Sequence, residues 1–245
     1  MNARPRKVEV IILGRGLAAA ALADALAQSG RRVALLAEEP GWERGTRPAW
    51  RGWHIGAQTA FAVAGAEMLA GWQAAGLPGI TEHDVGHAYP FWLLDLDQLL
   101  PALGERVAAS AGCWVATETR VRGVSVIENA ILGVIAEDSR YDARHVVNAA
   151  EDERHAAFAR MMREPQSLAL SHFTPTPDET VAVSASNQVS YPAATPFLRD
   201  EPAPTLGPTS VQGAWRIAGV AGWPVLALGA ATQLAAQLTA AFPAK

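Results

Sequence analysis

The chain has 245 residues, of which 50% are hydrophobic and 18% are charged, and its formal net charge is −4. This length is enough to bury roughly 70–75% of the surface that the unfolded chain exposes, and the composition is that of a globular protein. The negative charge and the absence of a dense Lys/Arg cluster argue against a nucleic-acid-binding surface. The single cysteine, Cys113, can form neither an internal disulfide nor a thiolate metal cage.

The apolar runs of the chain are too short or too interrupted for a membrane span, which needs roughly 20 apolar residues. A basic start (Arg4, Arg6 and Lys7) is followed by the apolar run Val8–Leu13, but glycine and arginine end that run at once. The run is therefore too short for the apolar region of a secretory signal. We expect a cytoplasmic protein without a membrane span.

The first forty residues predict a βαβ unit. Val8–Leu13 is short, apolar and β-branched, as a buried parallel strand is. Leu17–Ser29 is rich in alanine and predicts a helix, and Gly30 stands where a glycine commonly ends a helix. A second strand is predicted over Val33–Ala37. The unit has about the length of one β–α–β crossover.

The turn between this strand and this helix follows the pattern G-x-G-x-x-A. Its residues are Gly14, Arg15, Gly16, Leu17, Ala18 and Ala19. Such a turn directs backbone N–H groups and the positive end of the helix dipole at one point, which favours a pyrophosphate. The first glycine permits the tight turn, the second lets backbone and phosphate approach, and the small third residue lets helix and strand pack closely. A tight turn without a ligand is the alternative interpretation.

A dinucleotide site of this kind usually has an acidic residue at the end of its second strand, where the carboxylate binds the ribose hydroxyls. Glu38 and Glu39 are the candidates here. They come slightly late in the chain, because Ala37 occupies the expected position. The ribose contact is therefore weakened, or the strand carries one extra residue.

The remainder of the chain predicts further helices and strands. Helices are predicted over 59–73 and over 94–110, the latter capped by Asp97 because Pro101 suits only a first turn. Between them, 76–90 is expected to be a loop. The stretch 165–208 is rich in Pro, Ser and Thr and is expected to be irregular. Strands are predicted over 114–117, 120–127, 130–137, 139–142, 145–149, 180–184 and 214–218, with a last helix over 227–242.

Three blocks in this order resemble the FAD-dependent oxidoreductases of the D-amino-acid oxidase and glycine oxidase type, which have a glutathione-reductase-like fold. A meander at about 114–142 contains Val121-Arg122-Gly123-Val124 and leads into Ala143-Arg144-His145-Val146-Val147-Asn148-Ala149-Ala150. The final block is a strand, a glycine turn and a helix, beginning at Trp215. The resemblance implies an α/β fold with a Rossmann-like FAD-binding domain, a parallel sheet and a β-meander.

The same resemblance implies FAD as the cofactor and assigns roles to further residues. Val121 would contact the adenine through its backbone, and Ala149 and Ala150 would line the pyrophosphate. The turn from Gly219 to Val225, with Gly222 in it, would lie near the flavin ring. The catalytic residues are not identified by the sequence.

Two departures from that family matter. Glu151-Asp152 stands where the family usually has a glycine, and only about 60 residues separate Ala150 from Val211, where these oxidases usually insert a substrate-binding sheet. We therefore expect a substrate domain that is small or missing. One FAD-binding domain is expected from 1–45, 94–150 and 211–245, with 46–93 and 151–210 as insertions that form a reduced cap.

Other residue patterns give weaker hypotheses. His83 and His87 have the spacing of a helical metal pair, but Gly86 and Pro90 favour a loop, so no metal site is predicted. His54, in a segment rich in tryptophan, is a candidate for the flavin site or for an interface. No G-x-S-x-G motif and no P-loop occurs, which argues against a serine hydrolase and a phosphate-transfer enzyme.

Three functional hypotheses remain. The first is a flavoprotein oxidoreductase that oxidises a small molecule with an amine or hydroxy-acid group. The second is a degenerate, non-catalytic flavoprotein subunit that acts inside a larger complex, so that its partner is another subunit and an oligomer is possible. The third, an NAD(P)-linked dehydrogenase, fits less well, because the meander and the terminal block suit FAD.

Overall fold

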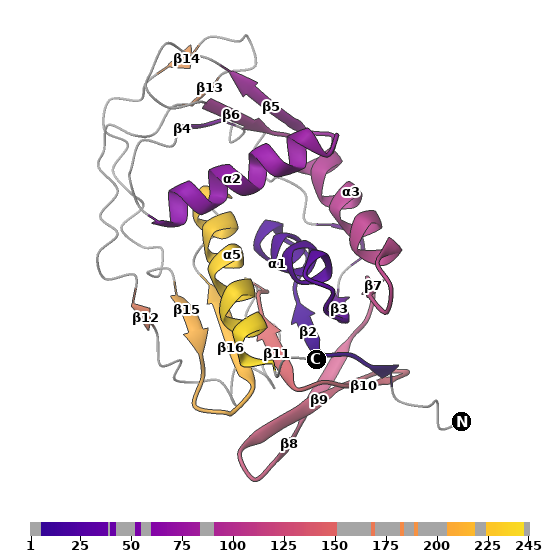
Figure 1. Ribbon diagram of the computed structural model, residues 1–245. Helices are drawn as coiled ribbons and strands as arrows, with labels where there is room; N and C mark the ends of the chain where they lie inside the picture. Colours follow the sequence, from indigo (N-terminus) through magenta and orange to yellow (C-terminus); the bar gives the residue numbers. More distant parts are fainter. Residues whose placement is uncertain are drawn as a thin grey trace.

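The computed structural model of the chain describes residues 6–38, 40–42, 52–54, 60–83, 91–150, 168–169, 182–183, 189–190, 205–218 and 224–242. A seven-stranded sheet is covered on one face by helices and on the other by a second sheet (Figure 1). A small third sheet is formed by three strands from 52–94. The architecture is therefore layered, with the large sheet in the middle.

The large sheet has the strand order β12-β15-β16-β11-β2-β3-β7. Its five strands from β16 to β7 are parallel, and β15 and β12 extend it as antiparallel strands. Every residue of β2 and β3 is buried, because helices and meander cover both faces of the sheet. The bounds are β2 Val10–Leu13, β3 Val33–Leu36, β7 Trp114–Ala116, β11 His145–Asn148, β12 Leu168–Ala169, β15 Thr205–Pro208 and β16 Ala214–Ala218.

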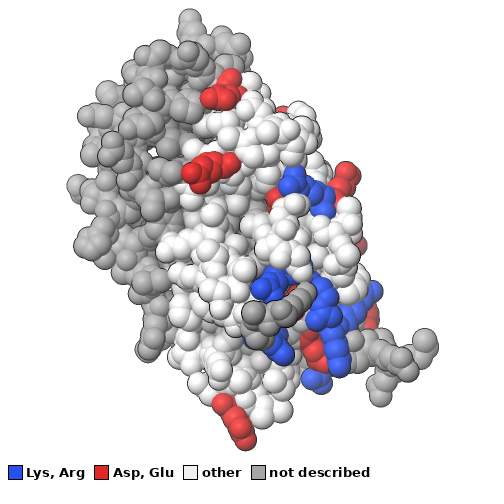
Figure 2. Space-filling model, in the orientation of Figure 1, with Lys and Arg blue, Asp and Glu red and all other residues white. Residues whose placement is uncertain are grey.

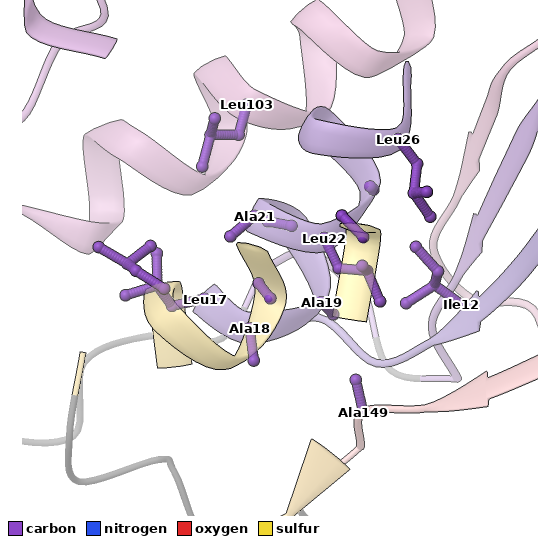
Figure 3. Packing of buried hydrophobic residues seen from close by; sticks show 14 of the residues in the cluster. Ile12, Leu17, Ala18, Ala19, Ala21, Leu22, Leu26, Leu103 and Ala149 are labelled. Carbon is purple, nitrogen blue, oxygen red and sulfur yellow. The ribbon is translucent and has the colours of Figure 1, made fainter. Parts of the chain in front are cut away.

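Four helices accompany this sheet: α1 Leu17–Gln28, α2 Ala60–Ala74, α3 Leu96–Ala109 and α5 Pro224–Ala241. Alternate strand residues such as Ile12 and Leu35 share a buried cluster with α1 side chains, and Figure 3 shows Leu22 and Leu26 of α1 near Ile12. The run of alanines in α1 is fully or almost fully buried. Such small side chains let α5, which packs on α1, approach its backbone closely.

The other face of the large sheet is covered by the meander, which consists of β8 Val121–Ile127, β9 Ala130–Ala136 and β10 Arg140–Asp142. Ile11 and Leu36 from the sheet are buried in one cluster with Val134 and Tyr141 from the meander. Residues 128 and 129 join β8 to β9 with φ angles of 49° and 65°, values that a tight hairpin turn requires. The N-terminal strand β1 (Arg6–Lys7) adds to this sheet in parallel with β10.

The structure confirms the predicted βαβ unit and the final strand and helix, and it corrects three predictions. Strand β7 lies in the large sheet, paired in parallel with β3, and is not part of the meander. The region expected as a loop contains β5 (Ile80–His83), which pairs with β6 (Phe91–Leu94) and, through β6, with β4 (Gly52–His54). Pairing with distant residues decides both cases, and a local pattern cannot reveal it.

The third correction concerns the start of α3. Asp95 caps it, with its carboxylate accepting a hydrogen bond from the Asp97 N–H at 3.2 Å. The helix therefore starts earlier than predicted, and Pro101 lies in its second turn. Proline there leaves the Asp97 carbonyl without its usual helical donor. The backbone of Asp95 is also tied to Gly79, whose carbonyl accepts its N–H at 2.8 Å.

Charged side chains of both signs share the face of the molecule seen in Figure 2, where blue and red groups lie next to one another. Several are ion pairs, such as Arg140 with Asp142 and Arg31 with Glu9. No helix of the described residues is long and apolar enough to cross a membrane. Within the same residues, no group of three or more His, Cys, Asp or Glu side chains could hold a metal ion.

Candidate functional site: the turn between β2 and α1

The carboxyl end of β2 lies between the ends of two neighbouring strands. The N–H of Gly14 donates to the Leu36 carbonyl of β3 at 2.9 Å, and the N–H of Ala149, after β11, donates to the Leu13 carbonyl at 2.8 Å. These bonds hold the three strand ends side by side.

Gly14 is required at this junction. Its φ is +140°, a conformation that other residues rarely adopt, and a Cβ built there would lie 2.7 Å from the Ala149 carbonyl oxygen. A side chain would therefore push β11 away from β2. The first glycine of the predicted motif thus has a structural reason that is independent of any ligand.

The junction is also the point where the strand order of the sheet reverses. From β2 the chain crosses through α1 to β3 on one side, whereas β11 and β16 lie on the other side. Ligands of open α/β sheets bind at such a switch point, outside the carboxyl ends of the strands, because the connecting segments diverge there. The position of the G-x-G-x-x-A turn is therefore the one where such a fold places a ligand.

The first turn of α1 presents backbone donors at this point. Gly16 is the N-cap and supplies no side chain, and the first turn has no acidic residue. The helical hydrogen bonds begin with the Ala20 N–H, which donates to the Gly16 carbonyl at 3.0 Å. The N–H groups of Leu17, Ala18 and Ala19 therefore have no acceptor within the helix. With the helix dipole they favour an anion.

Gly16 itself has φ −87° and ψ −178°, an extended conformation that any residue can adopt. The backbone therefore does not require glycine at this position. The missing side chain leaves room in front of the helix, which is what close approach of a phosphate needs.

The small third residue of the motif has the predicted packing role. Ala19 is fully buried, and Ala149 from β11 is 5% exposed. Figure 3 shows Ala149 directed toward the first turn of α1. The Ala150 N–H donates to the Asn148 side-chain oxygen at 3.1 Å, which shapes the chain just after β11. The structure thus brings together the motif and the two alanines predicted for the pyrophosphate.

The acidic candidate lies at the next strand end. Ala37 is 6% exposed, and its backbone continues the strand pairing: its N–H donates to Ala116 and its carbonyl accepts from Thr119. Glu38 follows, and its carboxylate lies 3.3 Å from the Arg120 Nε. Arg120 directly precedes Val121, the residue predicted to contact the adenine. The ends of β3 and the start of β8 are therefore joined at this corner of the site.

Several predicted residues cannot be placed. Glu39, Gly219, Gly222, Glu151-Asp152 and His87 lie outside the described residues. Val225, His54 and His83 belong to α5, β4 and β5, but their side chains lie outside the described part of the chain. Arg15 lies in the turn and is partly buried. The structure therefore describes the phosphate end of the predicted site and not the flavin end.

The residues described here fit an anionic dinucleotide: a donor-rich helix start, a junction without side chains and a carboxylate two strands' width along the same edge. Sequence reasoning missed Arg120 and Asn148 at this site. Nothing in the local sequence marks Arg120, because its partner Glu38 is 82 residues away in the chain. Asn148 lay inside the recognised block but carried no predicted role.

Comparison with known proteins supports this fold. No protein-family model matches the sequence, and no curated protein matches it. Among solved structures, L-proline dehydrogenase from P. horikoshii is similar with a TM-score of 0.67 and 13% identity, covering 96% of this chain and 94% of that chain. Glycine oxidase from Bacillus cereus has a TM-score of 0.64 and 12% identity, with 95% and 97% covered.

An FAD-dependent oxidoreductase from Pseudomonas aeruginosa has a TM-score of 0.65 and 14% identity, covering 99% of this chain and 94% of that chain. At these identities the likeness shows the fold alone. The chain has a mixed α/β fold with a parallel sheet, of the Rossmann-like kind found in FAD-binding oxidoreductases.

Proposed function

We propose that the chain binds FAD and acts as an oxidoreductase on a small molecule with an amine or hydroxy-acid group. The observation that carries the proposal is the junction of β2, α1 and β11. Gly14 lies against Ala149 there, and the N–H groups of Leu17, Ala18 and Ala19 point out of a helix start without a side-chain cap. The fold shared with FAD-dependent oxidoreductases supports the choice of FAD.

In this proposal the chain supplies position and charge. The first turn of α1 would bind the pyrophosphate through backbone N–H groups, and Ala149 and Ala150 would line its other side. Glu38 would accept hydrogen bonds from the ribose, and the start of β8 at Val121 would lie along the adenine. Bound FAD would supply the chemistry, by accepting a hydride from the substrate carbon. Gly219, Gly222 and Val225 are proposed for the flavin end.

The domain organisation is part of the proposal. The FAD-binding domain would consist of 1–45, 94–150 and 211–245, with 46–93 and 151–210 as a reduced cap. The separate sheet of β4, β6 and β5 supports this for the first insertion. Strand β15 of the second insertion pairs with β16 of the large sheet instead, so that insertion contributes to the domain as well.

Two names among the similar structures, a proline dehydrogenase and a glycine oxidase, support an amino acid over a hydroxy acid as the substrate class. The test is to mix loaded protein with each class in turn without oxygen. Loss of the oxidised-flavin absorbance with amino acids is the expected result. Loss with 2-hydroxy acids alone would reverse the choice of substrate.

A second candidate function is a flavoprotein subunit that is not catalytic by itself. Buried Ala37, at the position where an acidic residue is expected, favours it, because the ribose contact is then weaker. In that case the purified protein would bind FAD, but no amine or hydroxy acid would reduce it. Turnover by the isolated chain would exclude this alternative.

The variant Gly16→Asp tests the proposed binding site directly. An aspartate at the N-cap accepts hydrogen bonds from the first-turn N–H groups and stabilises the helix. The same carboxylate would occupy the anion site and repel a pyrophosphate. We expect Gly16→Asp to keep the thermal unfolding temperature of the wild type and to lose FAD binding. Equal FAD affinity in a folded variant would show that the start of α1 is not the phosphate site.

A further inference from the structure

The late position of the acidic residue changes the face of the strand on which it lies. In β3, Val33 and Leu35 belong to the buried cluster on the helix side, whereas Ala34 and Leu36 belong to the cluster on the meander side. Since side chains alternate along an extended strand, Ala37 continues on the helix side and Glu38 on the meander side. A shift of one residue thus moves the carboxylate to the other face of the sheet.

Arg120 meets this displaced carboxylate. Its Nε lies 3.3 Å from a Glu38 oxygen, and the exposed fractions of the two side chains are 66% and 33%. The backbone on both sides is fixed: Thr119 donates its N–H to the Ala37 carbonyl at 2.7 Å, and the Arg120 carbonyl accepts from Glu137 at 3.0 Å. Both charged groups are therefore delivered to one place by strand pairing.

We propose that Arg120 is a positioning residue that holds the Glu38 carboxylate at the ribose end of the dinucleotide site. The inference rests on the proposed function, because Glu38 needs a ribose to act on. Arg120 compensates for the one-residue displacement by fixing the carboxylate at the start of β8, beside the residue predicted to contact the adenine.

This arrangement has a chemical consequence. A guanidinium has only donors, so Arg120 can bind the carboxylate but cannot replace it as an acceptor for ribose hydroxyls. Removing Arg120 should leave the contact possible but less well oriented. Removing the charge of Glu38 should weaken the contact itself. Arg120 therefore acts through Glu38, and its effect should vanish when Glu38 is neutral.

The experiment compares ADP with 2′-deoxy-ADP as ligands of the purified protein, by isothermal titration calorimetry. The wild type should prefer ADP, because charge-assisted hydrogen bonds to the ribose add affinity; about tenfold is the expected preference. Glu38→Gln should abolish the preference. Arg120→Gln should reduce it by about two- to fivefold, the range of an exposed ion pair. The double variant should equal Glu38→Gln.

Arg122→Gln is the matched control. Arg122 lies two residues further along the same strand and forms an exposed ion pair with Glu137, which has no place in the proposed site. This variant should bind ADP and 2′-deoxy-ADP as the wild type does. FMN, which lacks the adenosine half of FAD, should bind equally to the wild type and to Arg120→Gln. A merely structural role of Arg120 would change FMN binding too.

The outcomes separate this inference from the proposed function. If the wild type binds neither FAD nor ADP, the proposed function fails. If it binds both, and Arg120→Gln keeps the full preference for ADP over 2′-deoxy-ADP, the positioning role of Arg120 is overturned while the FAD site stands. A double variant weaker than Glu38→Gln would also overturn it, because Arg120 would then act independently of Glu38.

Discussion

The indole N–H of Trp72 donates to a carboxylate oxygen of Asp24 at 2.8 Å, and both residues are almost completely buried. The second Asp24 oxygen lies 2.9 Å from the Nε of Arg106. Asp24 belongs to α1, Trp72 to α2 and Arg106 to α3. One buried charge therefore connects three helices, and it fixes the helix whose first turn forms the proposed phosphate site.

We predict that Asp24→Asn destabilises the protein by about 2 kcal/mol. The substitution keeps the shape of the side chain but weakens the hydrogen bond from Trp72 and leaves Arg106 without its counter-charge. The cost stays moderate because the Arg106 side chain is 29% exposed and can be solvated. Urea unfolding followed by tryptophan fluorescence measures the change.

Asp97→Asn is the control for this prediction, since Asp97 is an exposed acidic residue in the first turn of α3. It should cost about 0.5 kcal/mol, the size of a helix-dipole effect. An equal loss in both variants would contradict the special role of Asp24.

Acid should weaken the structure at His145. Its Nδ1 accepts a hydrogen bond from the Trp215 Nε1–H at 3.1 Å, and the Phe242 ring lies edge-on to it. Burial, and secondly the charge of Arg144, hold the pKa of His145 below its usual range. A protonated Nδ1 cannot accept from Trp215, so the contact requires the neutral ring.

The sign of the pH dependence follows from that lowered pKa. The unfolded chain binds the proton at a pKa of roughly 6.5, above the pKa in the folded state. The stability from His145 is therefore complete above roughly pH 6.5 and is lost as the pH falls through the pKa of the folded state. Comparison of unfolding free energies at several pH values should show a smaller acid loss in His145→Leu. An identical acid loss in both proteins would contradict this.

Gly14 and Gly30 provide a matched pair of glycine substitutions. Both have positive φ, but a Cβ at Gly14 would lie 2.7 Å from a backbone oxygen, whereas a Cβ at Gly30 meets nothing within 4 Å. Gly30→Ala should cost about 1 kcal/mol, from backbone strain alone. Gly14→Ala should cost about 3 kcal/mol, because overpacking adds to the strain. Equal unfolding midpoints for the two variants would refute the close approach of β2 and β11.

Cys113 should be a slow thiol. It is 8% exposed, and its Sγ lies 3.3 Å from the Arg31 carbonyl oxygen. Burial raises the pKa of the thiol, and the charge of Glu9 adds to this. Less thiolate means a slower reaction. A chromogenic disulfide reagent should modify native Cys113 much more slowly than the unfolded protein; equal rates would contradict its burial.

Local patterns were sufficient for the parts of the fold that are close in sequence. The alternation of strand and helix from Val10 to Leu36 was predicted because apolar runs, alanines and glycines occur there in the order that a crossover needs. The turn at Gly14 was predicted for the same reason. What the sequence could not reveal is that its Cα lies against Ala149, because strand order decides it.

Long-range pairing explains the errors. Strand β7 was assigned to the meander, although it pairs with β3 nearly 80 residues earlier. The small sheet of β4, β5 and β6 is short and irregular in sequence, so its region read as a loop. Asp95 and Asp97 are both good caps, and only the backbone contact of Asp95 with Gly79 distinguishes them. The Arg120–Glu38 and Trp72–Asp24 contacts are of the same kind.

The measurement that tests the central claim most directly is an equilibrium titration of the purified, flavin-free protein with FAD, followed by flavin fluorescence. The site at the start of α1 predicts saturable binding of one FAD per chain, and weaker binding of FMN, which lacks the pyrophosphate and adenosine. It also predicts that NADH does not compete at similar concentrations. No uptake of FAD, or binding of NADH without FAD, would contradict the account.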